Sequence, residues 1–292
     1  MKVATAGWVF AAPALTVIAV FFGLPVLAAF ALSLTDFDIY ALADLDNLRF
    51  VGLGNYVALL QNPLFWQALG NTVYFVAVGV PLSIVMSLGA ALLLHSRLGY
   101  LKPVFRTAYF APVVTTVVAV AVIWRYLFHT RYGLVNWALS GLGIDPVDWL
   151  GDPDWAMPTI ILFAVWKNFG YNMIIFLAGL QAIPEDLYEA ARIDGASRLR
   201  QFWHVTLPML GPVLLLVGIL TMAGYFQLFA EPYVMTQGGP LQSTVSVLYL
   251  MYEEGFKWWN LGNASAVAFL LFVLMTAITS ALLWFARRQG AE

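Results

Sequence analysis

The residues best suited to specific chemistry lie in one charged stretch near the middle of the sequence, EDLYEAARIDGASRLRQFWHVTLPML, Glu185 to Leu210. Only 10% of the 292 residues are charged, and long apolar runs lie on both sides of this stretch. Pro184 suits the first turn of a helix, and Gly195 suits a left-handed helix end. We predict a helix of about 11 residues between them, polar enough to contact a soluble partner.

A second group of polar and aromatic residues falls inside the apolar runs. The segment VWKNFGYN, residues 165–172, carries a lysine, whose charge is costly inside a membrane. Aromatic faces stack on sugar C–H surfaces, and amides and hydroxyls bond sugar hydroxyls, as in a small-ligand site. The alternative is ordinary helix packing, with Lys167 reaching toward the outer interface. In TMAGYFQLFAEPY, residues 221–233, we interpret Glu231-Pro232 as a capping or gating detail.

Several kinds of catalytic site are excluded by the residue types. There are no cysteines, so thiol catalysis, disulfides and thiolate metal sites are absent. His95, His129 and His204 are far apart, and two of them fall on opposite sides of the predicted membrane, so they do not form one metal site. No segment matches the phosphate-binding loop G-x-x-x-x-G-K-[ST]. We therefore predict no catalytic or metal-ligating residues, and ATP hydrolysis, where needed, by another chain.

The elements that position these residues are long apolar runs. The chain is 62% hydrophobic with a mean hydropathy of +0.82, and its runs are long enough to cross a hydrocarbon core of about 30 Å. The first run extends to Leu34, longer than the apolar part of a signal peptide, so we keep it as an uncleaved crossing. We predict an all-α integral membrane protein with one transmembrane domain over 1–292. Its expected helices are 8–34, 68–95, 104–128, 158–182, 208–231 and 264–286, with a polar loop over 184–207.

Lysine and arginine gather on one side of these helices. The opposite loops hold Arg49, Arg131 and Lys257 alone. The positive-inside rule therefore places both termini and the charged stretch in the cytoplasm. The residues on the basic side are Lys2, Arg97, Lys102, Arg106, Arg192, Arg198, Arg200, Arg287 and Arg288.

An interfacial helix on lipid headgroups is the alternative for the charged stretch. Such a helix carries bulky apolar residues and a basic polar face. The predicted helix instead has one base, Arg192, and an anionic membrane surface would repel its acids. A protein partner fits better. The acids are Glu185, Asp186, Glu189 and Asp194.

At this point a family resemblance becomes specific. EAARIDG, with nine residues between it and VTLP, resembles the signature loop of ABC importer permeases, although Val205 stands where isoleucine is usual. Other segments resemble the carbohydrate-uptake branch, the permeases similar to those for maltose and glycerol phosphate. The likeness covers nearly the whole chain. These segments are NTVYF at 71–75, RYGLVN at 131–136, YVMTQGGP at 233–240 and LGNASAVAF at 261–269.

The resemblance implies a mechanism and a set of partners. The chain would be the permease subunit of an ATP-driven, binding-protein-dependent importer, for a sugar or oligosaccharide. It would pair with a second homologous permease, dock on a cytoplasmic ABC ATPase dimer and receive solute from an extracytoplasmic binding protein. ATP and Mg would be used by the ATPase, so this chain is expected to bind no cofactor and no nucleic acid. Its place would be the prokaryotic cytoplasmic (inner) membrane, among lipids, with several crossings.

The resemblance also assigns residues. In maltose-type permeases the helices matching 158–182 and 208–231 line the solute path. The residue types here differ from a strict maltose pattern, which leaves the sugar open. The coupling residues would be Glu189, Ala190, Ala191, Asp194, Gly195, Leu207 and Pro208. The solute-path residues would be Trp166, Lys167, Asn168, Tyr171, Thr221, Gly224, Tyr225 and Leu228.

Two other functions compete with this interpretation. An ion-coupled secondary transporter usually buries acids in mid-membrane and shows inverted repeats with broken helices. The sequence has no clear repeat, and among its acids only Glu231 approaches an apolar run. A membrane-embedded metal hydrolase needs clustered ligands, which the three histidines do not supply.

Overall fold

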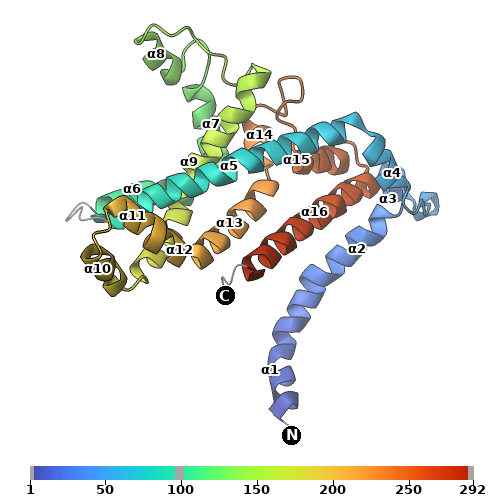
Figure 1. Cartoon of the computed structure of the whole chain (residues 1–292). Coiled ribbons are helices and arrows are strands. Elements are labelled where there is room, and N and C mark those ends of the chain that lie inside the picture. The colour runs from blue at the N-terminus through green and yellow to red at the C-terminus, as the bar shows by residue number, and fades with distance from the viewer. Residues whose placement is uncertain (1–2, 96–101, 289–292) are drawn as a thin grey trace. The chain divides into compact units, whose positions relative to one another are not determined.

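The computed structural model describes residues 3–95 and 102–288, and its regular structure is helical (Figure 1). Within these ranges the one β feature is an isolated antiparallel bridge between Thr35 and Phe50. The predicted all-α class is confirmed. The chain forms two compact units, one from Met1–Trp66 and Leu250–Val273, the other from Gln67–Tyr249 and Leu274–Glu292. Each unit is described by itself below.

The first unit is built around an apolar N-terminal helix. Gly7–Ser33 is long and apolar enough to span a membrane, and none of its most apolar window is buried within the chain. A helix that is apolar all round and uncovered is stable only in lipid or against another chain. The unit contains α1 (Val3–Ile18), the π-helical segment η1 (Ala19–Gly23), α2 (Leu24–Ser33), α3 (Ile39–Ala43), the 3-10 turn η2 (Leu45–Asn47), α4 (Gly54–Gln61), the π-helical segment η5 (Glu253–Lys257) and parts of α5, α15 and α16.

Two kinds of contact hold the first unit together. The Asn55 side-chain amide donates to the backbone carbonyls of Ser33 (2.9 Å) and Thr35 (2.7 Å), which fixes α4 beside the end of α2. The rings of Phe30 and Phe269 lie 5.2 Å apart and pack α2 against α16. Hydrogen bonds at the end of α2 and an aromatic contact along its side thus together position this helix.

The second unit holds most of the chain, including the central spans. Its elements are most of α5 (Pro63–His95), α6 (Lys102–Val114), α7 (Val117–Leu127), α8 (Leu134–Ser140), α9 (Pro153–Gln181), α10 (Glu185–Ile193), α11 (Arg198–Gln201), the π-helical segment η4 (Phe202–Thr206), α12 (Leu207–Met209), α13 (Gly211–Phe226), α14 (Ala230–Met235), and parts of α15 (Val247–Tyr252) and α16 (Leu261–Arg288).

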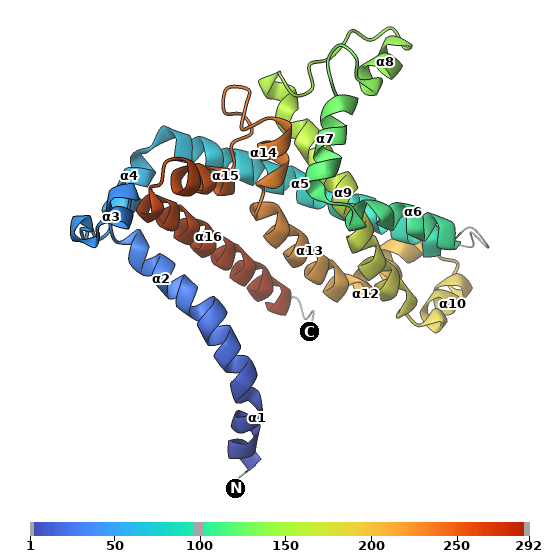
Figure 2. The ribbon, with the colours of Figure 1, turned by 180° about the vertical axis from the view of Figure 1, so that it is seen from behind.

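The core of the second unit lies where α9 packs between its neighbours. Over half of the most apolar window of α9 is buried, against about a quarter of that of α5. Phe176 and Met173 of α9 are fully buried and belong to one hydrophobic core cluster with Ala91 of α5 and Val217 of α13. The three helices run close together in both views (Figures 1 and 2). Because α9 is the most enclosed of the four unbroken spans, most of its side chains face protein rather than lipid.

The third expected span is broken in two. The structure has α6 and α7 at an angle of 101°, where the sequence predicts one helix over 104–128. Pro112 lies one turn before the break, and the Thr115 hydroxyl bonds the Pro112 carbonyl at 2.6 Å. Thr116 then adopts extended dihedral angles. A proline inside a helix removes one backbone donor, and here the local polar groups complete the break.

The fifth span is also bent. A helical stretch, Arg198–Met209, meets α13 at an angle of 67°. Pro212 has no N–H to donate to the carbonyl four residues earlier, so the ladder is interrupted near Leu210 and Gly211. The span ends at Phe226 rather than residue 231, and residues 198–207, expected as loop, are helical. Among the described residues the structure therefore has four unbroken candidate spans and two bent pairs, which give six crossings, the number predicted, if each bent pair is one span.

The loop after α14 is fixed to the beginning of α5. The Asn71 amide donates to the carbonyls of Gln242 and Val245, both at 2.9 Å. The Val247 N–H donates to the Thr72 hydroxyl at 3.0 Å. These bonds bridge residues more than 170 positions apart, so this loop and the start of α5 form one rigid feature.

Candidate functional site

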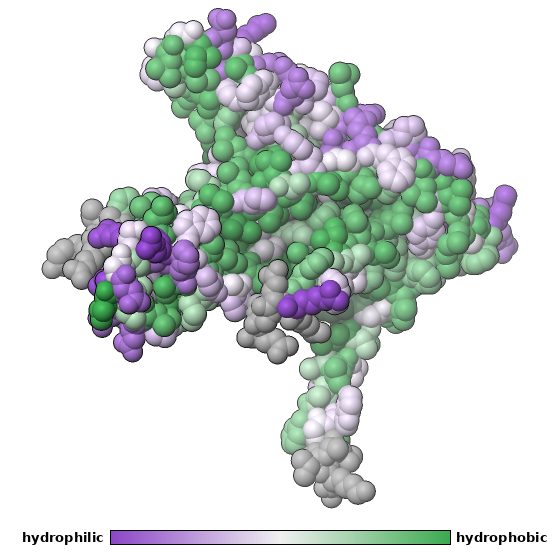
Figure 3. All heavy atoms as spheres, viewed as in Figure 1, coloured by the Kyte–Doolittle hydropathy of each residue, from purple (hydrophilic) through white to green (hydrophobic). Residues whose placement is uncertain are grey.

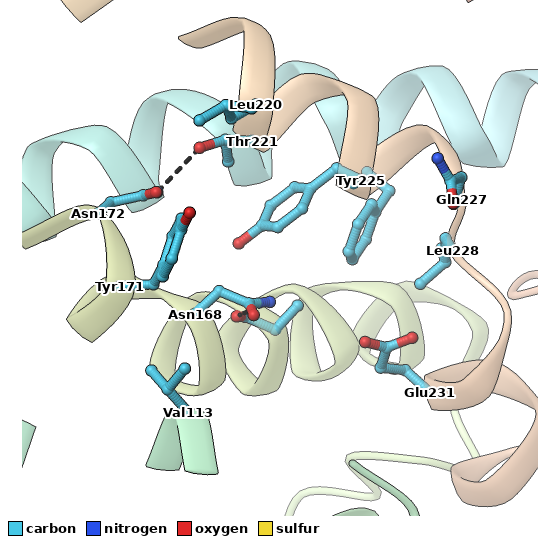
Figure 4. Close-up of a pocket in the computed structure, with 13 residues that line it drawn as sticks. Val113, Asn168, Tyr171, Asn172, Leu220, Thr221, Tyr225, Gln227, Leu228 and Glu231 are labelled. Atoms are coloured by element: carbon cyan, nitrogen blue, oxygen red, sulfur yellow. Dashed lines mark hydrogen bonds between the residues drawn. The ribbon is translucent and has the colours of Figure 1, made fainter. Parts of the chain in front are cut away.

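A cavity of about 260 Å³ opens between α9 and α13, beside the start of α14 (Figure 4). It is the place where the most enclosed span presents polar side chains to an open volume. Both of the helices predicted to carry a solute path contribute to its wall. The lining residues are Phe75, Val113, Ala164, Asn168, Tyr171, Asn172, Leu220, Thr221, Gly224, Tyr225, Gln227, Leu228 and Glu231.

A polar network ties the two helices together on one side of the cavity. The Asn172 side-chain amide donates to the Thr221 hydroxyl at 2.8 Å, marked in Figure 4, and to the Ser83 hydroxyl at 3.3 Å. All three residues are buried. Since unpaired polar groups are costly in an apolar surrounding, these bonds fix the Asn172 rotamer and the spacing of α9 and α13.

Tyr225 of α13 leaves a donor free at the centre of the cavity. Its side chain is 4% exposed, and its hydroxyl forms no hydrogen bond with the described residues. Ser83 and Asn168 lie near enough to interact with it electrostatically, but not in hydrogen-bonding geometry. Figure 4 shows the hydroxyl directed into the space beside Tyr171 and Asn168. A buried hydroxyl without a partner is positioned to bond a ligand.

The position of the Tyr225 ring depends on a glycine. The ring stacks at a tilt on Phe75, with centroids 5.0 Å apart. A Cβ added at Gly79 of α5 would lie 2.8 Å from Tyr225 Cε2. Gly79 therefore provides the room that one edge of the Tyr225 ring occupies beside α5.

The structure brings six of the eight expected solute-path residues to this one cavity. These are Asn168, Tyr171, Thr221, Gly224, Tyr225 and Leu228. Trp166 lies elsewhere, with its ring 5.3 Å from that of Trp124 of α7. Tyr171 is half exposed, and in Figure 4 its ring stands at the cavity wall.

Lys167 has a structural position instead. It is 7% exposed, and its ammonium donates to the Val113 carbonyl at 3.2 Å. Val113 lies in the last turn of α6, where the break leaves carbonyls without helical donors. Lys167 thus caps the end of α6, and it is not among the residues that line the cavity.

Sequence reasoning passed over several lining residues. Asn172 lies one turn after Asn168, so helical spacing was the signal that identifies it. Glu231 was interpreted as a capping or gating detail, yet it lines the cavity from the first turn of α14. Figure 4 shows its carboxyl group directed toward α9. Among the described residues it forms no ion pair.

The predicted charged helix is α10, and its ends are built as the sequence indicates. Pro184 is its N-cap, and Glu185 and Asp186 occupy its first turn. At the other end Gly195 has φ of +76°, its N–H bonds the Arg192 carbonyl, and the Ala196 N–H bonds the Ala191 carbonyl. This pair of bonds is the Schellman motif, which depends on a residue that tolerates positive φ.

The body of α10 is almost uncovered by the rest of the chain. None of its residues is buried, and the Ile193 side chain is 86% exposed. One side-chain bond anchors it, between the Tyr188 and Thr206 hydroxyls at 2.9 Å. Hydrophilic residues gather over α10 and α11 while apolar residues cover the spans (Figure 3). A short exposed helix with an uncovered isoleucine at its tip has the geometry that we expect of a docking element.

The expected coupling residues fall on this element and on the bent helix that follows. Glu189, Ala190, Asp194 and Gly195 are exposed, and Ala191 is partly covered. Leu207 and Pro208 begin α12, directly after Thr206. Glu189 pairs with Arg192 at 3.8 Å, and so does Glu185. Such exposed pairs add little stability, so these charges are available to a partner.

Comparison with known proteins decides the family. The model of the family described as binding-protein-dependent transport system inner membrane component matches residues 79–290. This chain belongs to that family. The permease is 41% identical to the lactose transport system permease protein LacF of Rhizobium radiobacter, over 97% of this chain and 94% of the relative. It is 40% identical to the trehalose/maltose transport system permease protein MalF of Thermococcus litoralis, over 94% of this chain and 90% of the relative.

A solved structure shares the fold. A chain of the bacterial alginate ABC transporter, crystallised in complex with an alginate pentasaccharide-bound periplasmic protein, superposes on the permease with a TM-score of 0.83. The match covers 97% of this chain and 94% of that chain, at 21% sequence identity. At this identity the likeness establishes the fold alone.

Family membership settles the class of function. The protein is an ABC transporter permease subunit of the inner membrane with several crossings, and it works with a binding protein. It is not itself the ATPase. The ion-coupled transporter and the membrane enzyme are therefore set aside.

Proposed function

We propose that this permease forms half of the translocation path of an importer for a sugar or oligosaccharide. The observation that supports it most is the cavity between α9 and α13, where Asn168, Tyr171 and the free Tyr225 hydroxyl face one open volume. Amide and hydroxyl groups bond sugar hydroxyls, and a tyrosine ring offers a face to sugar C–H groups. Relatives named for lactose, trehalose and maltose favour the same solute class.

The size of the cavity indicates how much of the solute it holds. Its volume of about 260 Å³ is below the roughly 300–1,000 Å³ typical of pockets that enclose a whole small ligand. We infer that one part of the saccharide occupies it at a time and that a second, homologous permease contributes the other wall. The extracytoplasmic binding protein would deliver the solute to this path.

The coupling step would pass through α10. In this proposal the exposed helix enters a groove of a cytoplasmic ABC ATPase dimer, which alone uses ATP and Mg. Closure of that dimer would displace α10 as a rigid body, and the Tyr188–Thr206 bond would carry the displacement to α12 and α13. Both termini would lie in the cytoplasm on the same side as α10.

The test is transport by the complete importer in reconstituted vesicles. Lactose, maltose and trehalose are offered in turn with the cognate binding protein, and an amino acid serves as the solute of a different class. We expect ATP-dependent uptake of at least one saccharide. Tyr171→Ala and Asn168→Ala should each raise the half-saturating concentration of that saccharide about tenfold. Each removes one stacking contact or one hydrogen bond between uncharged groups.

Trp166→Phe is the matched control, because Trp166 lies on α9 but packs on α7 rather than on the cavity. It should leave the half-saturating concentration unchanged. Uptake of the amino acid but of no saccharide would refute the solute class. Equal effects of all three substitutions would refute the placement of the solute in this cavity.

A further inference from the structure

A second cavity, of about 300 Å³, lies at the other end of α9. It is formed where α5 ends, α6 begins and α9 reaches its last turns. Its wall combines two bases, Lys102 and Arg106, with the polar side chains of His95, Thr107 and Gln181, and with apolar residues from the same three helices. No part of the proposed solute path reaches it.

The charged side chains in the wall of this cavity are both basic. Lys102 and Arg106 are one turn apart on α6, so both ammonium and guanidinium groups extend from the same side of the helix. No acidic residue contributes to the wall. Across 3–95 and 102–288, neither base forms an ion pair, whereas Arg192 on α10 pairs with two acids. The cavity thus presents uncompensated positive charge.

The remaining wall is apolar, which distinguishes the cavity from a site for a free ion. Leu94 of α5 and Leu177 of α9 line it together with the bases. Phe105, three residues after Lys102 and on the same side of α6, is 36% exposed. A ligand that satisfies both parts of the wall carries an anionic group next to hydrocarbon.

The position of the cavity in the membrane indicates which ligand of this kind is available to it. His95 and Gln181 also line the neighbouring hollow beside α10, so the two cavities adjoin on one side of the membrane. With α10 in the cytoplasm, the basic cavity lies at the headgroup level of the cytoplasmic leaflet. Anionic lipids are recognised by basic pockets between helix ends on this side.

We propose that the Lys102–Arg106 cavity binds the phosphate group of an anionic phospholipid of the cytoplasmic leaflet. The two bases and the Thr107 hydroxyl would hold the phosphate oxygens, and Leu94, Leu177 and Phe105 would contact the acyl chains. A bound lipid would join the ends of α5, α6 and α9 beside the coupling helix. The proposal does not depend on which solute the permease carries.

The full-length permease in a non-ionic detergent is titrated with phosphatidylglycerol and, separately, with phosphatidylcholine of the same acyl chains, and bound lipid is counted by native mass spectrometry. We expect one tightly bound phosphatidylglycerol whose affinity falls with salt. Each base near a membrane surface contributes about fivefold in affinity, so Lys102→Ala with Arg106→Ala should weaken binding about 25-fold.

Two matched variants separate the cavity from general surface charge and from loss of folding. Arg200→Ala with Arg288→Ala also removes two bases, but neither residue lines the cavity, so binding should stay within twofold. The charge-preserving exchange Lys102→Arg with Arg106→Lys should retain the lipid. Inorganic phosphate, added as a competitor, distinguishes the source of the phosphate group. Weak displacement supports a lipid, and full displacement with equal affinity supports a free phosphate in the same site.

Besides full displacement by inorganic phosphate, three results would overturn the proposal. The first is phosphatidylglycerol binding by the Lys102→Ala, Arg106→Ala variant within twofold of the parent. The second is phosphatidylcholine binding as tight as phosphatidylglycerol binding. The third is an equal loss in the Arg200→Ala, Arg288→Ala variant, which would show that net charge alone attracts the lipid.

Discussion

The α9–α13 cavity and the helix α10 differ in how far the rest of the chain encloses their side chains. The cavity residues are enclosed, and their side chains are held by bonds such as that from Asn172 to Thr221. Those of α10 are open to solvent, and the helix is kept in place by its two ends and by one tyrosine hydroxyl. The cavity is arranged within the chain, whereas we expect α10 to be covered by a partner protein.

This difference predicts how each region responds to mutation. A change in the cavity alters packing and solute contacts together, because the same side chains do both. A change on the surface of α10 leaves the fold intact and reaches function only through the partner.

The largest effect is expected at the end of α10. Gly195→Pro fixes φ near −65° where the chain has +76° and removes the N–H that bonds Arg192. ATP-dependent uptake in vesicles should fall to background while membrane insertion, followed by extraction and size-exclusion chromatography, is unchanged. Gly195→Asn is the control, since asparagine tolerates positive φ, and it should keep most of the uptake. Normal uptake by the proline variant would contradict a role of this helix end in coupling.

A smaller effect is expected from filling the space behind Tyr225. Gly79→Ala places a Cβ against the ring and should rotate the hydroxyl away from the cavity centre. Overpacking costs about 1–3 kcal/mol, so the half-saturating solute concentration in the uptake assay should rise about tenfold. Gly89→Ala, on the same helix with open space around its Cβ position, should behave as the parent. If the two alanines act alike, the ring position is unimportant for the solute.

Substitution of Lys167 tests whether this polar residue of α9 stabilises the fold without affecting the choice of solute. Lys167→Met leaves the Val113 carbonyl without its donor and should lower the free energy of unfolding by about 1–3 kcal/mol. The thermal midpoint of the purified permease reports this loss, and solute preference should not change. Asn168→Ala should give the reverse pattern. A shift in solute preference with Lys167→Met would bring this lysine back into the solute path.

The smallest effect is expected at the hydrogen bond that links α10 to the bent helix after it. Tyr188→Phe removes the hydroxyl that bonds Thr206, worth about 1 kcal/mol. The ratio of solute moved to ATP hydrolysed should fall a few-fold, with little change in thermal stability. Adding Thr206→Val should have no further effect, because both variants break the same bond. Additive losses would show that the two hydroxyls act separately.

The two regions also differ in how far the sequence predicts them. The bounds of α10 and its left-handed end follow from Pro184 and Gly195, since helix caps depend on a few neighbouring residues. The same helical spacing that grouped Asn168 with Tyr171 and Thr221 with Tyr225 places these residues at one cavity. Short-range rules are sufficient for both results.

The parts that sequence reasoning missed depend on contacts between distant segments. The break after Val114 was not predicted, because prolines such as Pro112 are often tolerated within membrane helices. Without the break, there was no exposed carbonyl to explain Lys167. The cavity role of Glu231 depends in turn on the early end of α13 at Phe226, which lets α14 turn back over the opening.

The length of α5 has its own consequence for the whole permease. Its 33 residues make a rod of about 50 Å, while the hydrocarbon layer is about 30 Å thick. The surplus must emerge into the headgroups or be taken up by tilt. One end of α5 is hydrogen-bonded to the loop after α14, and at the other end His95 lines the basic cavity. Because α5 is helical along its whole length, we expect a displacement of the loop after α14 to be passed along this helix to the basic cavity.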